Sequence, residues 1–288
     1  MSPTHSVITL THNKLEVTRK CLATLLGTRQ ANWELVVVDN GSSDGTREWL
    51  ESFQTDAADH GVAVRLLFND SNIGCSTARN QGAELAEGRL LTFVDNDIAL
   101  RSSQWLNKLA RPIQEDSGIA MTGPKLVYPL PPHRIQCAGA AVAPTGRILF
   151  RGRGEERTEP RFNKRTEVQC LISACFMVER DAFKNAGGFD EAYNPVEFED
   201  LDLCYKIRAA GKRILYLPEV EMYHFESVTT AGTPSLPNTA LIVRNGLLFK
   251  KRWKHMFEYE NGPDDEAARW KKLPPYDFND AADLPVIE

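Results

Sequence analysis

Two carboxylates and an amide, Asp95-Asn96-Asp97, directly follow a short apolar run, Leu90–Val94. The run predicts a strand that is buried on both faces. A carboxylate at the end of such a strand must be solvated, hydrogen-bonded or bound to a cation, because a buried unpaired charge is costly. A helix cap is a poor explanation for Asp97, since the chain continues directly into Ile98-Ala99-Leu100. These residues are therefore candidates for a functional site.

Three more polar clusters follow predicted strands in the same way: Thr11-His12-Asn13, Asp39-Asn40 and Asn69-Asp70. The carboxyl ends of parallel strands lie at one edge of a sheet, where α/β proteins bind their ligands. Four clusters at one edge favour one site over four unrelated loops. The alternative is that these polar residues, above all those at 40–44, only cap helices and form turns.

A second group of acids, Glu199-Asp200-Leu201-Asp202, opens a predicted helix. The helix dipole stabilises negative side chains near its N-terminus. N-capping accounts for one acid at this position, so three acids exceed that requirement. His224 lies in the run EMYHF, and it is either a hydrogen-bonded core or edge histidine or a metal ligand.

The elements that must position these residues alternate between strands and helices over the first hundred residues. Apolar runs predict strands at 6–10, 35–38, 64–68 and 90–94. Helical periodicity predicts helices at 14–26 and 76–86, and a third helix that Ser42 or Ser43 caps and that runs to about Phe53. Strands separated by helices imply crossover connections, so we expect a largely parallel sheet.

The remainder of the chain is predicted to be more extended. Strands are expected at 119–127, 138–142, 147–151, 168–178, 213–217 and 220–225. Helices are expected at 105–113, 180–185, 199–210 and 238–256, the last followed by an acidic, proline-containing tail.

Composition bounds the class of protein. The 288 residues are 42% hydrophobic and 25% charged, which is ordinary for a globular protein. A net charge of −5 and a pI near 5.8 argue against a nucleic-acid partner. We expect a cytoplasmic protein, because the N-terminus lacks the features of a signal peptide, no window resembles a membrane span, and the six cysteines form no Cys-x-x-Cys pair and suit small buried residues.

The chain resembles the inverting family 2 glycosyltransferases of the GT-A fold. Five stretches carry the resemblance in order: VVVDNGSSDGT (36–46), NIGCSTARNQG (72–82), LLTFVDNDI (90–98), GGFDEAYNPVEFEDLDLCYKIRAAGKRILYLPEVEMYHFES (187–227) and the helix that follows. The similarity is greatest to rhamnosyl-type enzymes that build surface polysaccharides and O-antigens. The resemblance implies an α/β, Rossmann-like GT-A fold, with a mixed but mainly parallel central sheet, flanking helices and a C-terminal helical extension.

The resemblance also implies a domain organisation. Residues 1–260 would form a single glycosyltransferase domain. Within it, residues 1–100 would bind the nucleotide, residues 101–230 would bind the acceptor, and residues 236–257 would form the C-terminal helix. Residues 261–288 would be the tail.

The polar sheet edge would bind a nucleotide-diphosphate sugar, UDP- or dTDP-linked. Asp39 would accept the imide N–H of uracil or thymine, with Thr11 and Asn13 beside the base. Arg79 would lie at the nucleotide, with the donor or Asp95 as its negative partner. A surface salt bridge is the alternative for Arg79. The other implied nucleotide-binding residues are Asn72, Gly74, Asp95 and Asn96.

The chemical step is implied by the acidic helix and the metal site. Asp200 would be the catalytic base that takes the proton of the acceptor hydroxyl, so that one displacement inverts the anomeric configuration. Glu199 and Ser173 would lie near the donor or acceptor sugar, and Asp202 would be structural. The leaving diphosphate gains negative charge, which a hard divalent cation, Mn²⁺ or Mg²⁺, can stabilise. Asp97 and His224 are the implied metal ligands.

One departure from the family bears on the product. Processive synthases of the family carry Gln-x-x-Arg-Trp, whereas here Phe249 precedes Lys250-Lys251-Arg252-Trp253 without the glutamine. With no flanking membrane span in the sequence, this predicts transfer of one sugar to a saccharide or lipid-linked saccharide. The basic aromatic stretch FKKRWKHMF (249–257) either touches anionic lipid at the inner face of a membrane or packs on the core as an ordinary helix.

Two other functions fit part of the pattern. A nucleotidyltransferase also joins a Rossmann-like sheet to a carboxylate–metal site, but it usually has a glycine-rich basic loop near the first strand, and TLTHNKLEVTRK contains no glycine. A non-catalytic partner that binds sugar nucleotides could share the fold, because fold alone does not prove activity. The sequence makes no prediction of the oligomeric state.

Overall fold

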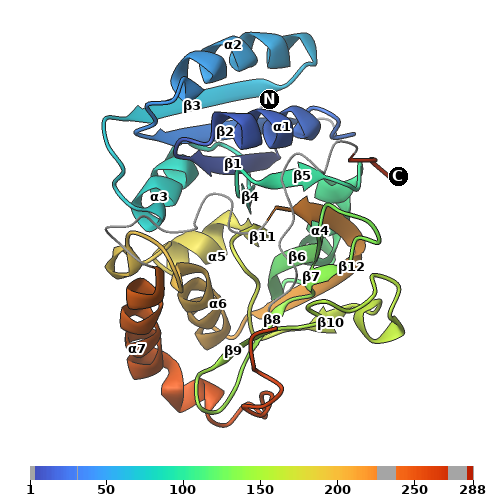
Figure 1. Ribbon diagram of the computed structural model, residues 1–288, viewed down its shortest axis with the longest axis vertical. Coiled ribbons are helices and arrows are strands. Elements are labelled where there is room, and N and C mark those ends of the chain that lie inside the picture. Colours follow the sequence, from blue (N-terminus) through green and yellow to red (C-terminus); the bar gives the residue numbers. More distant parts are fainter. Residues whose placement is uncertain (1–3, 31, 226–237, 272–283, 288) are drawn as a thin grey trace.

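The computed structural model describes residues 4–30, 32–225, 238–271 and 284–287, and its main feature is a mixed sheet covered by helices (Figure 1). In this part of the chain ten strands join the sheet, eight of them in the order β10-β12-β6-β11-β4-β1-β2-β3, while β5 pairs with β12 and β7 with β6. The strands of the sheet are β1 (His5–Thr11), β2 (Trp33–Asn40), β3 (Ala63–Asn69), β4 (Leu90–Val94), β5 (Ile98–Leu100), β6 (Ile119–Val127), β7 (Ile135–Cys137), β10 (Thr166–Glu167), β11 (Cys175–Glu179) and β12 (Arg213–His224). A separate ribbon consists of β8 (Ala140–Val142) and β9 (Ile148–Phe150). The helices are α1 (Leu15–Leu25), α2 (Thr46–Asp59), α3 (Cys75–Leu85), α4 (Trp105–Glu115), α5 (Arg180–Asn185), α6 (Glu199–Ala209) and α7 (Asn238–Phe257).

Alternate residues of the central strands face two different apolar layers. Val7 and Leu35 pack in a cluster with side chains of α1, α2 and α4. Their neighbours Ile8 and Val36 pack in another cluster with α3, α5, α6 and α7. Because successive side chains of a strand point to opposite faces, the helices cover both faces of the sheet. This explains why the strand sequences are continuously apolar rather than alternating.

The four strands predicted in the first hundred residues are present and parallel. β1 pairs with β2 and β4, and β2 pairs with β3. The register places Thr11 beside Asp39, and Asn40 beside Asn69. The predicted gathering of polar residues at the carboxyl edge is therefore confirmed for these strands.

The second half of the sheet brings distant segments to the end of β4. β11 is inserted antiparallel between β4 and β6, and β12 runs parallel to β6 and antiparallel to β5. The backbone N–H of Asp95 donates to the carbonyl of Ala174 at 3.0 Å, and His224 pairs with Ile98. Antiparallel pairing thus places the 173–174 segment and His224 next to Asp95–Asp97.

The prediction of a strand at 168–178 is wrong for residues 168–174. Only Cys175–Glu179 form β11, and the preceding segment is mostly buried but irregular. Cys170 makes an isolated bridge to Ala140, and the N–H of Ser173 donates to the side chain of Asp200. Apolar content predicts burial, whereas backbone pairing here depends on partners that are distant in sequence.

The predicted serine cap of the second helix is also wrong. α2 begins at Thr46, after Gly45 with φ 91°. The hydroxyl of Ser42 instead accepts the N–H of Asn13 at 2.7 Å, and the side chain of Asp44 accepts both the N–H and the hydroxyl of Thr46. The serine therefore orders the loop at the sheet edge.

The two strands expected on either side of Pro218 form one strand, β12. A register shift lies between Leu217 and Glu221, where Leu217 pairs with Pro124 and Glu221 with Lys125. A bulge of this kind accommodates the missing N–H of proline within one strand.

The C-terminal helix is present as α7, and residues 236 and 237 of the predicted range lie outside the described residues. Parts of the tail pack on the domain, since Ile287 forms a parallel bridge with Ser102 and Trp270 meets Phe150 edge to face. Residues 272–283 and 288 of the predicted tail lie outside the described residues. Among the described helices, none is long and apolar enough to span a bilayer.

Candidate active site

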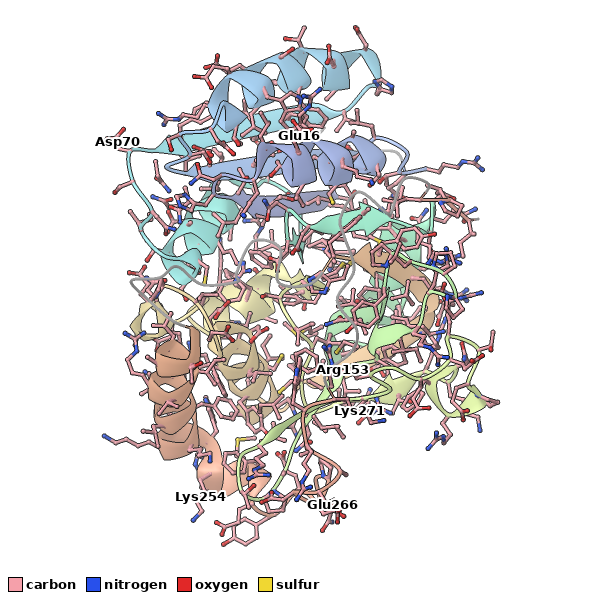
Figure 2. All side chains as sticks on the ribbon, in the orientation of Figure 1. Glu16, Asp70, Arg153, Lys254, Glu266 and Lys271 are labelled. Atoms are coloured by element: carbon pink, nitrogen blue, oxygen red, sulfur yellow. The ribbon has the colours of Figure 1, made fainter. Side chains whose placement is uncertain are left out.

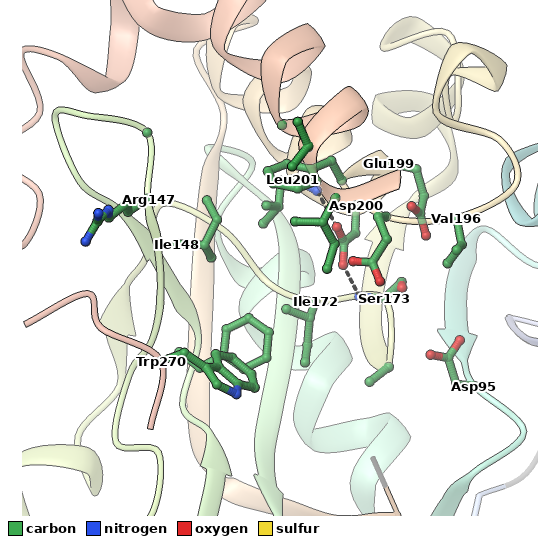
Figure 3. A pocket seen from close by; sticks show the side chains of 18 of the residues that line it. Asp95, Arg147, Ile148, Ile172, Ser173, Val196, Glu199, Asp200, Leu201 and Trp270 are labelled. Atoms are coloured by element: carbon green, nitrogen blue, oxygen red, sulfur yellow. Dashed lines mark hydrogen bonds between the residues drawn. The ribbon is translucent and has the colours of Figure 1, made fainter. Parts of the chain in front are cut away.

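A cavity of about 840 Å³ opens beside the end of β4 (Figure 3). Its walls come from the ends of β4 and β12, the 172–174 segment, the start of α6 and one side of α7. The lining residues that carry ionisable groups are Arg79, Asp95, Asp97, Arg147, Glu197, Glu199, Asp200, His224 and Lys250. Figure 2 shows the side chains of the described residues in the orientation of Figure 1. The cavity joins the two acidic groups that the sequence singled out.

Asp39 lies at the carboxyl end of β2 and is fully buried. Its Oδ2 accepts the N–H of Ser42 at 3.1 Å and lies 3.5 Å from Nε of Arg47. Its Oδ1 is buried without a hydrogen-bond partner among the described residues. A buried carboxylate oxygen with a free lone pair suits an N–H donor supplied by a ligand.

The side chains of Thr11 and Asn96 both make contacts within the protein. The amide of Asn96 donates to the hydroxyl of Thr18 at 2.9 Å and approaches that of Thr11 at 3.4 Å. The two threonine hydroxyls are 3.1 Å apart. This buried cluster ties the end of β4 to β1 and α1, so the two residues position the sheet edge.

Asn13 has left-handed backbone, with φ 57°, and its side chain accepts the N–H of Ser43 at 2.8 Å. The structure therefore joins the loop after β1 to the loop after β2. Asn13 remains exposed to an intermediate degree, at the same edge as Asp39.

Asn72 and Gly74 shape the loop before α3. The side-chain oxygen of Asn72 accepts the amide of Asn40 at 2.9 Å and the N–H of Gly74 at 3.0 Å. Gly74 has φ 90°, and a Cβ there would lie 2.3 Å from the side chain of Asn194. Only glycine fits this position, which lets the loop before α3 approach the segment before α6.

Arg79 bridges the two acidic groups. Its guanidinium contacts Oδ1 of Asp95 at 2.7 Å and Oε1 of Glu199 at 2.6 Å. It is 6% exposed, and its Cζ lies 5.6 Å from the ring centroid of Phe189. The expected partner Asp95 is thus present, and the surface salt-bridge alternative is wrong because Arg79 is buried. Burial raises the pKa of Asp95, and Arg79 opposes that shift.

Asp97 and His224 are buried neighbours. Asp97 directly precedes β5, and His224 is the last residue of β12. Oδ1 of Asp97 lies 3.5 Å from Nε2 of His224, and Nδ1 of His224 lies 3.2 Å from Oε1 of Gln136. Gln136 fixes the orientation of the imidazole, as outer partners of metal ligands do. No cluster of three or more His, Cys, Asp or Glu side chains suited to a metal occurs within the described residues. Two ligands still fit Mg²⁺ or Mn²⁺, because these ions commonly take their other ligands from substrate phosphates and water.

Asp200 lies in the middle of the cavity wall, close to Ser173 (Figure 3). Its Oδ2 accepts the N–H of Ser173 at 2.8 Å, and its Oδ1 accepts the N–H of Leu201 at 2.7 Å. Burial, followed by the charge of Glu199, raises the pKa of Asp200 to about 7. A carboxylate with this pKa is suited to accept a proton near neutral pH.

Asp202 is structural, as expected. It is fully buried and accepts hydrogen bonds from Tyr193 at 3.1 Å and from the indole of Trp253 at 2.8 Å. Arg252 contacts Asp190 at 2.6 Å and Asp202 at 3.2 Å. Two residues of FKKRWKHMF are therefore committed to internal contacts.

The aromatic residues of FKKRWKHMF also face the protein. Phe249 and Phe257 are buried, and Trp253 packs against Tyr205 with their ring centroids 5.7 Å apart. The core-packing alternative is confirmed for these side chains, and the exposed positions of the stretch are Lys251, Lys254 and His255.

Two residues that shape the cavity, Glu197 and Asn245, were not predicted from the sequence. Glu197 lines it with φ 85°, and burial raises its pKa to about 7. Asn245 of α7 is buried, and its amide lies 2.8–2.9 Å from the carbonyl oxygens of Tyr193, Val196 and Glu197. Asn245 was detectable as the polar residue between Leu241 and Phe249 at a spacing of four, on the buried face of the helix.

Comparison with known proteins gives a consistent result. A family model described as "Glycosyl transferase family 2" matches residues 6–187. An uncharacterized protein of Sinorhizobium fredii is 32% identical over 88% of the chain, and the chain spans 28% of that relative's length. An N-acetylglucosaminyl-diphospho-decaprenol L-rhamnosyltransferase of Mycobacterium tuberculosis is 28% identical, over 80% of the chain and 78% of the relative.

Among solved structures, a crystal structure of GalNAc-T7 with UDP, GalNAc and Mn²⁺ has a TM-score of 0.70 at 18% identity. The match covers 89% of this chain and 49% of that chain. This likeness confirms the predicted GT-A fold.

Proposed function

The chain belongs to glycosyl transferase family 2, and we propose on that basis that it transfers a single sugar, with inversion, from a UDP- or dTDP-sugar to an acceptor hydroxyl. One observation carries the proposal. Asp200, with a pKa raised to about 7, lies in one cavity with Asp95, Asp97, Arg79 and His224. A base and a diphosphate-binding edge on opposite sides of one space are what a direct displacement requires.

The donor would bind along the carboxyl edge of the sheet. The free oxygen of Asp39 would accept the imide N–H of the base, and the loops that carry Asn13 and Asn72 would flank the nucleoside. The diphosphate would reach the end of β4, so that the sugar lies between Asp95 and Asp200. Arg79 holds both Asp95 and Glu199, and it thereby fixes the nucleotide side of the cavity relative to the base.

The chemical step would occur at the anomeric carbon. Asp200 would take the proton of the acceptor hydroxyl while that oxygen forms the new bond to the anomeric carbon. The bond from the anomeric carbon to the diphosphate oxygen would break, and the diphosphate would leave with the electron pair. Attack from the face opposite the leaving group inverts the configuration.

Asp97 and His224 are the residues that would hold a divalent cation. When bound, Mn²⁺ or Mg²⁺ supplies positive charge beside the leaving diphosphate. The fit rests on the hard carboxylate of Asp97 next to an imidazole that Gln136 orients, a donor pair that suits Mn²⁺.

Replacing Asp97 with alanine should weaken the binding of UDP in the presence of Mn²⁺ by at least about 10–100-fold, because a direct ligand should matter no less than an outer partner. The change keeps the Asp97 carbonyl that accepts the N–H of Phe225. Calorimetry with UDP and with dTDP, each with and without Mn²⁺, measures the effect. The matched control is Asp59→Ala, at the exposed end of α2.

Unchanged Mn²⁺-dependent affinity in Asp97→Ala would exclude Asp97 as a metal ligand. Failure of the wild-type protein to bind either nucleotide would count against the proposed donor class itself.

The acceptor is proposed to be a saccharide or lipid-linked saccharide of a cell-surface polysaccharide pathway. The support is the similarity to a relative whose name specifies an acceptor on diphospho-decaprenol. Such an acceptor would place the enzyme at the cytoplasmic face of a membrane, in peripheral contact with it.

A further inference from the structure

Exposed apolar side chains of the described residues gather at the cavity. Seven large hydrophobic residues of this part of the chain are exposed, and four of them line the cavity: Ile242, Val243, Leu247 and Trp270. Their exposed fractions run from 44% for Ile242 to 64% for Leu247. An apolar patch concentrated in one concave place marks a binding surface.

This patch lies beyond the catalytic base. In Figure 3, Asp95 lies at one end of the view and Trp270 at the other, with Asp200, Ser173 and Ile172 between them. Ile148, next to Trp270 in the view, belongs to the same far wall. In the function proposed above the donor binds at the Asp95 end, so an acceptor that attacks from the opposite face would enter from the far half.

The chemistry of the far half does not suit a purely polar acceptor. Among the described residues that line the cavity, Gln136 and Ser173 are the neutral polar side chains, and Gln136 already contacts His224. A chain of sugars needs many hydrogen-bonding partners, because each buried hydroxyl left unpaired costs free energy. Ile148, Phe150 and Leu247 instead offer apolar contact.

Two cations accompany the apolar residues. Lys250 lies against the Gly146 turn, where an added Cβ would be 2.6 Å from its Cε, and its ammonium makes no hydrogen bond or ion pair with the described residues. Arg147 lies in the same wall, 3.8 Å from Asp265. Of the acids that line the cavity, Asp95 and Glu199 lie toward the other end and Asp200 lies between (Figure 3). The far half therefore combines positive charge with apolar surface.

We propose that the far half of the cavity binds the carrier of the acceptor: an apolar chain joined to the acceptor sugar through a phosphate. Lys250 and Arg147 bind the phosphate, while Val243, Leu247 and Trp270 contact the first part of the chain. The inference rests on the transfer function proposed above, and it assigns the acceptor class to specific residues.

Farnesyl phosphate is the probe, because it carries both groups without a sugar. Titration below its micelle concentration, with UDP and Mn²⁺ saturating so that the donor half is filled, should show binding to the wild-type protein. Val243→Glu and Lys250→Gln should each weaken that binding by about tenfold. The first removes an apolar contact to the chain, and the second removes a cation that binds the phosphate. The matched controls, Val286→Glu and Lys251→Gln, change an exposed valine and an exposed lysine outside the cavity and should bind like the wild type.

Farnesol and inorganic phosphate should each bind at least tenfold more weakly than farnesyl phosphate. Equal binding of farnesol, or equal affinities across all four variants, would overturn the proposal. Binding to anionic vesicles is measured last, for the wild-type protein and for Val243→Glu. If Val243→Glu abolishes vesicle binding while farnesyl phosphate never binds, the patch is a membrane contact and the acceptor assignment is wrong. UDP binding measured without the probe reports separately on the proposed donor class.

Discussion

Replacing Asp200 with asparagine should reduce sugar transfer by about 10²–10⁴-fold, the usual contribution of a general base. The amide keeps the size of the side chain but cannot take the proton of an acceptor hydroxyl. Both carboxylate oxygens accept a backbone N–H, so the amide leaves one of these donors without its acceptor. We expect that loss to cost about 1–3 kcal/mol of stability, which a folded domain can tolerate.

The readouts for Asp200→Asn are kcat, KM, the melting temperature and the affinity for UDP. We expect kcat to fall while UDP affinity is unchanged, because the proposed nucleotide contacts do not involve Asp200. A loss confined to KM would assign Asp200 to acceptor binding instead.

The pH dependence of transfer gives a second test of the same residue. The base must be ionised, so wild-type transfer should fall by about tenfold per pH unit below about 7. Glu199, Glu197 and Arg79 are the charged groups around this part of the cavity, and burial also raises the pKa of Glu197 to about 7. Glu197→Gln is therefore the matched control, and it should retain the acidic limb. If the fall in transfer rate below about pH 7 is absent from Glu197→Gln, Glu197 and not Asp200 is the base.

Replacing Arg79 with methionine should destabilise the protein by about 3–5 kcal/mol, the cost of leaving buried charges without their partner. Arg79 is 6% exposed and contacts two carboxylates, of which Glu199 is 2% exposed. Methionine retains an unbranched apolar stem in place of the aliphatic part of arginine, so the main loss is the guanidinium and its two ion pairs. Denaturant unfolding measures the change as a shift of the midpoint.

Arg89→Met is the matched control for Arg79. Arg89 is 57% exposed in its side chain and lies 3.4 Å from Glu179, so its removal should cost no more than about 1 kcal/mol. Equal destabilisation by the two changes would show that the buried bridge has no special role. Arg79→Lys should recover only part of the stability, because one ammonium lacks the fork that reaches both acids.

The sequence predicted the fold of residues 1–100 well, for a physical reason. Strands buried on both faces are continuously apolar, so β1, β2 and β4 were recognisable without any knowledge of their partners. Since these strands are parallel, their carboxyl ends had to meet, which placed Asp39 near Thr11. Local pattern and global topology agree in this half of the chain.

The second half was less predictable because its order depends on long-range pairing. Residues 168–174 have strand-like composition but pack irregularly against β8 and α6. The bridge from Arg79 to Glu199 spans 120 positions in the sequence, and no periodicity signals it. Of the missed cavity residues, Asn245 left a signal in the helix spacing, whereas Glu197 owes its position to a left-handed backbone.

The anomeric configuration of the released sugar tests the proposed direct displacement. The purified protein is incubated with a panel of UDP- and dTDP-sugars and Mn²⁺, and proton NMR follows the sugar released by donor hydrolysis before it mutarotates. We expect that at least one donor is cleaved and that the first sugar released has the configuration opposite to that of the donor. Release with retained configuration, or cleavage of no donor in the panel, would contradict the direct displacement and the role assigned to Asp200.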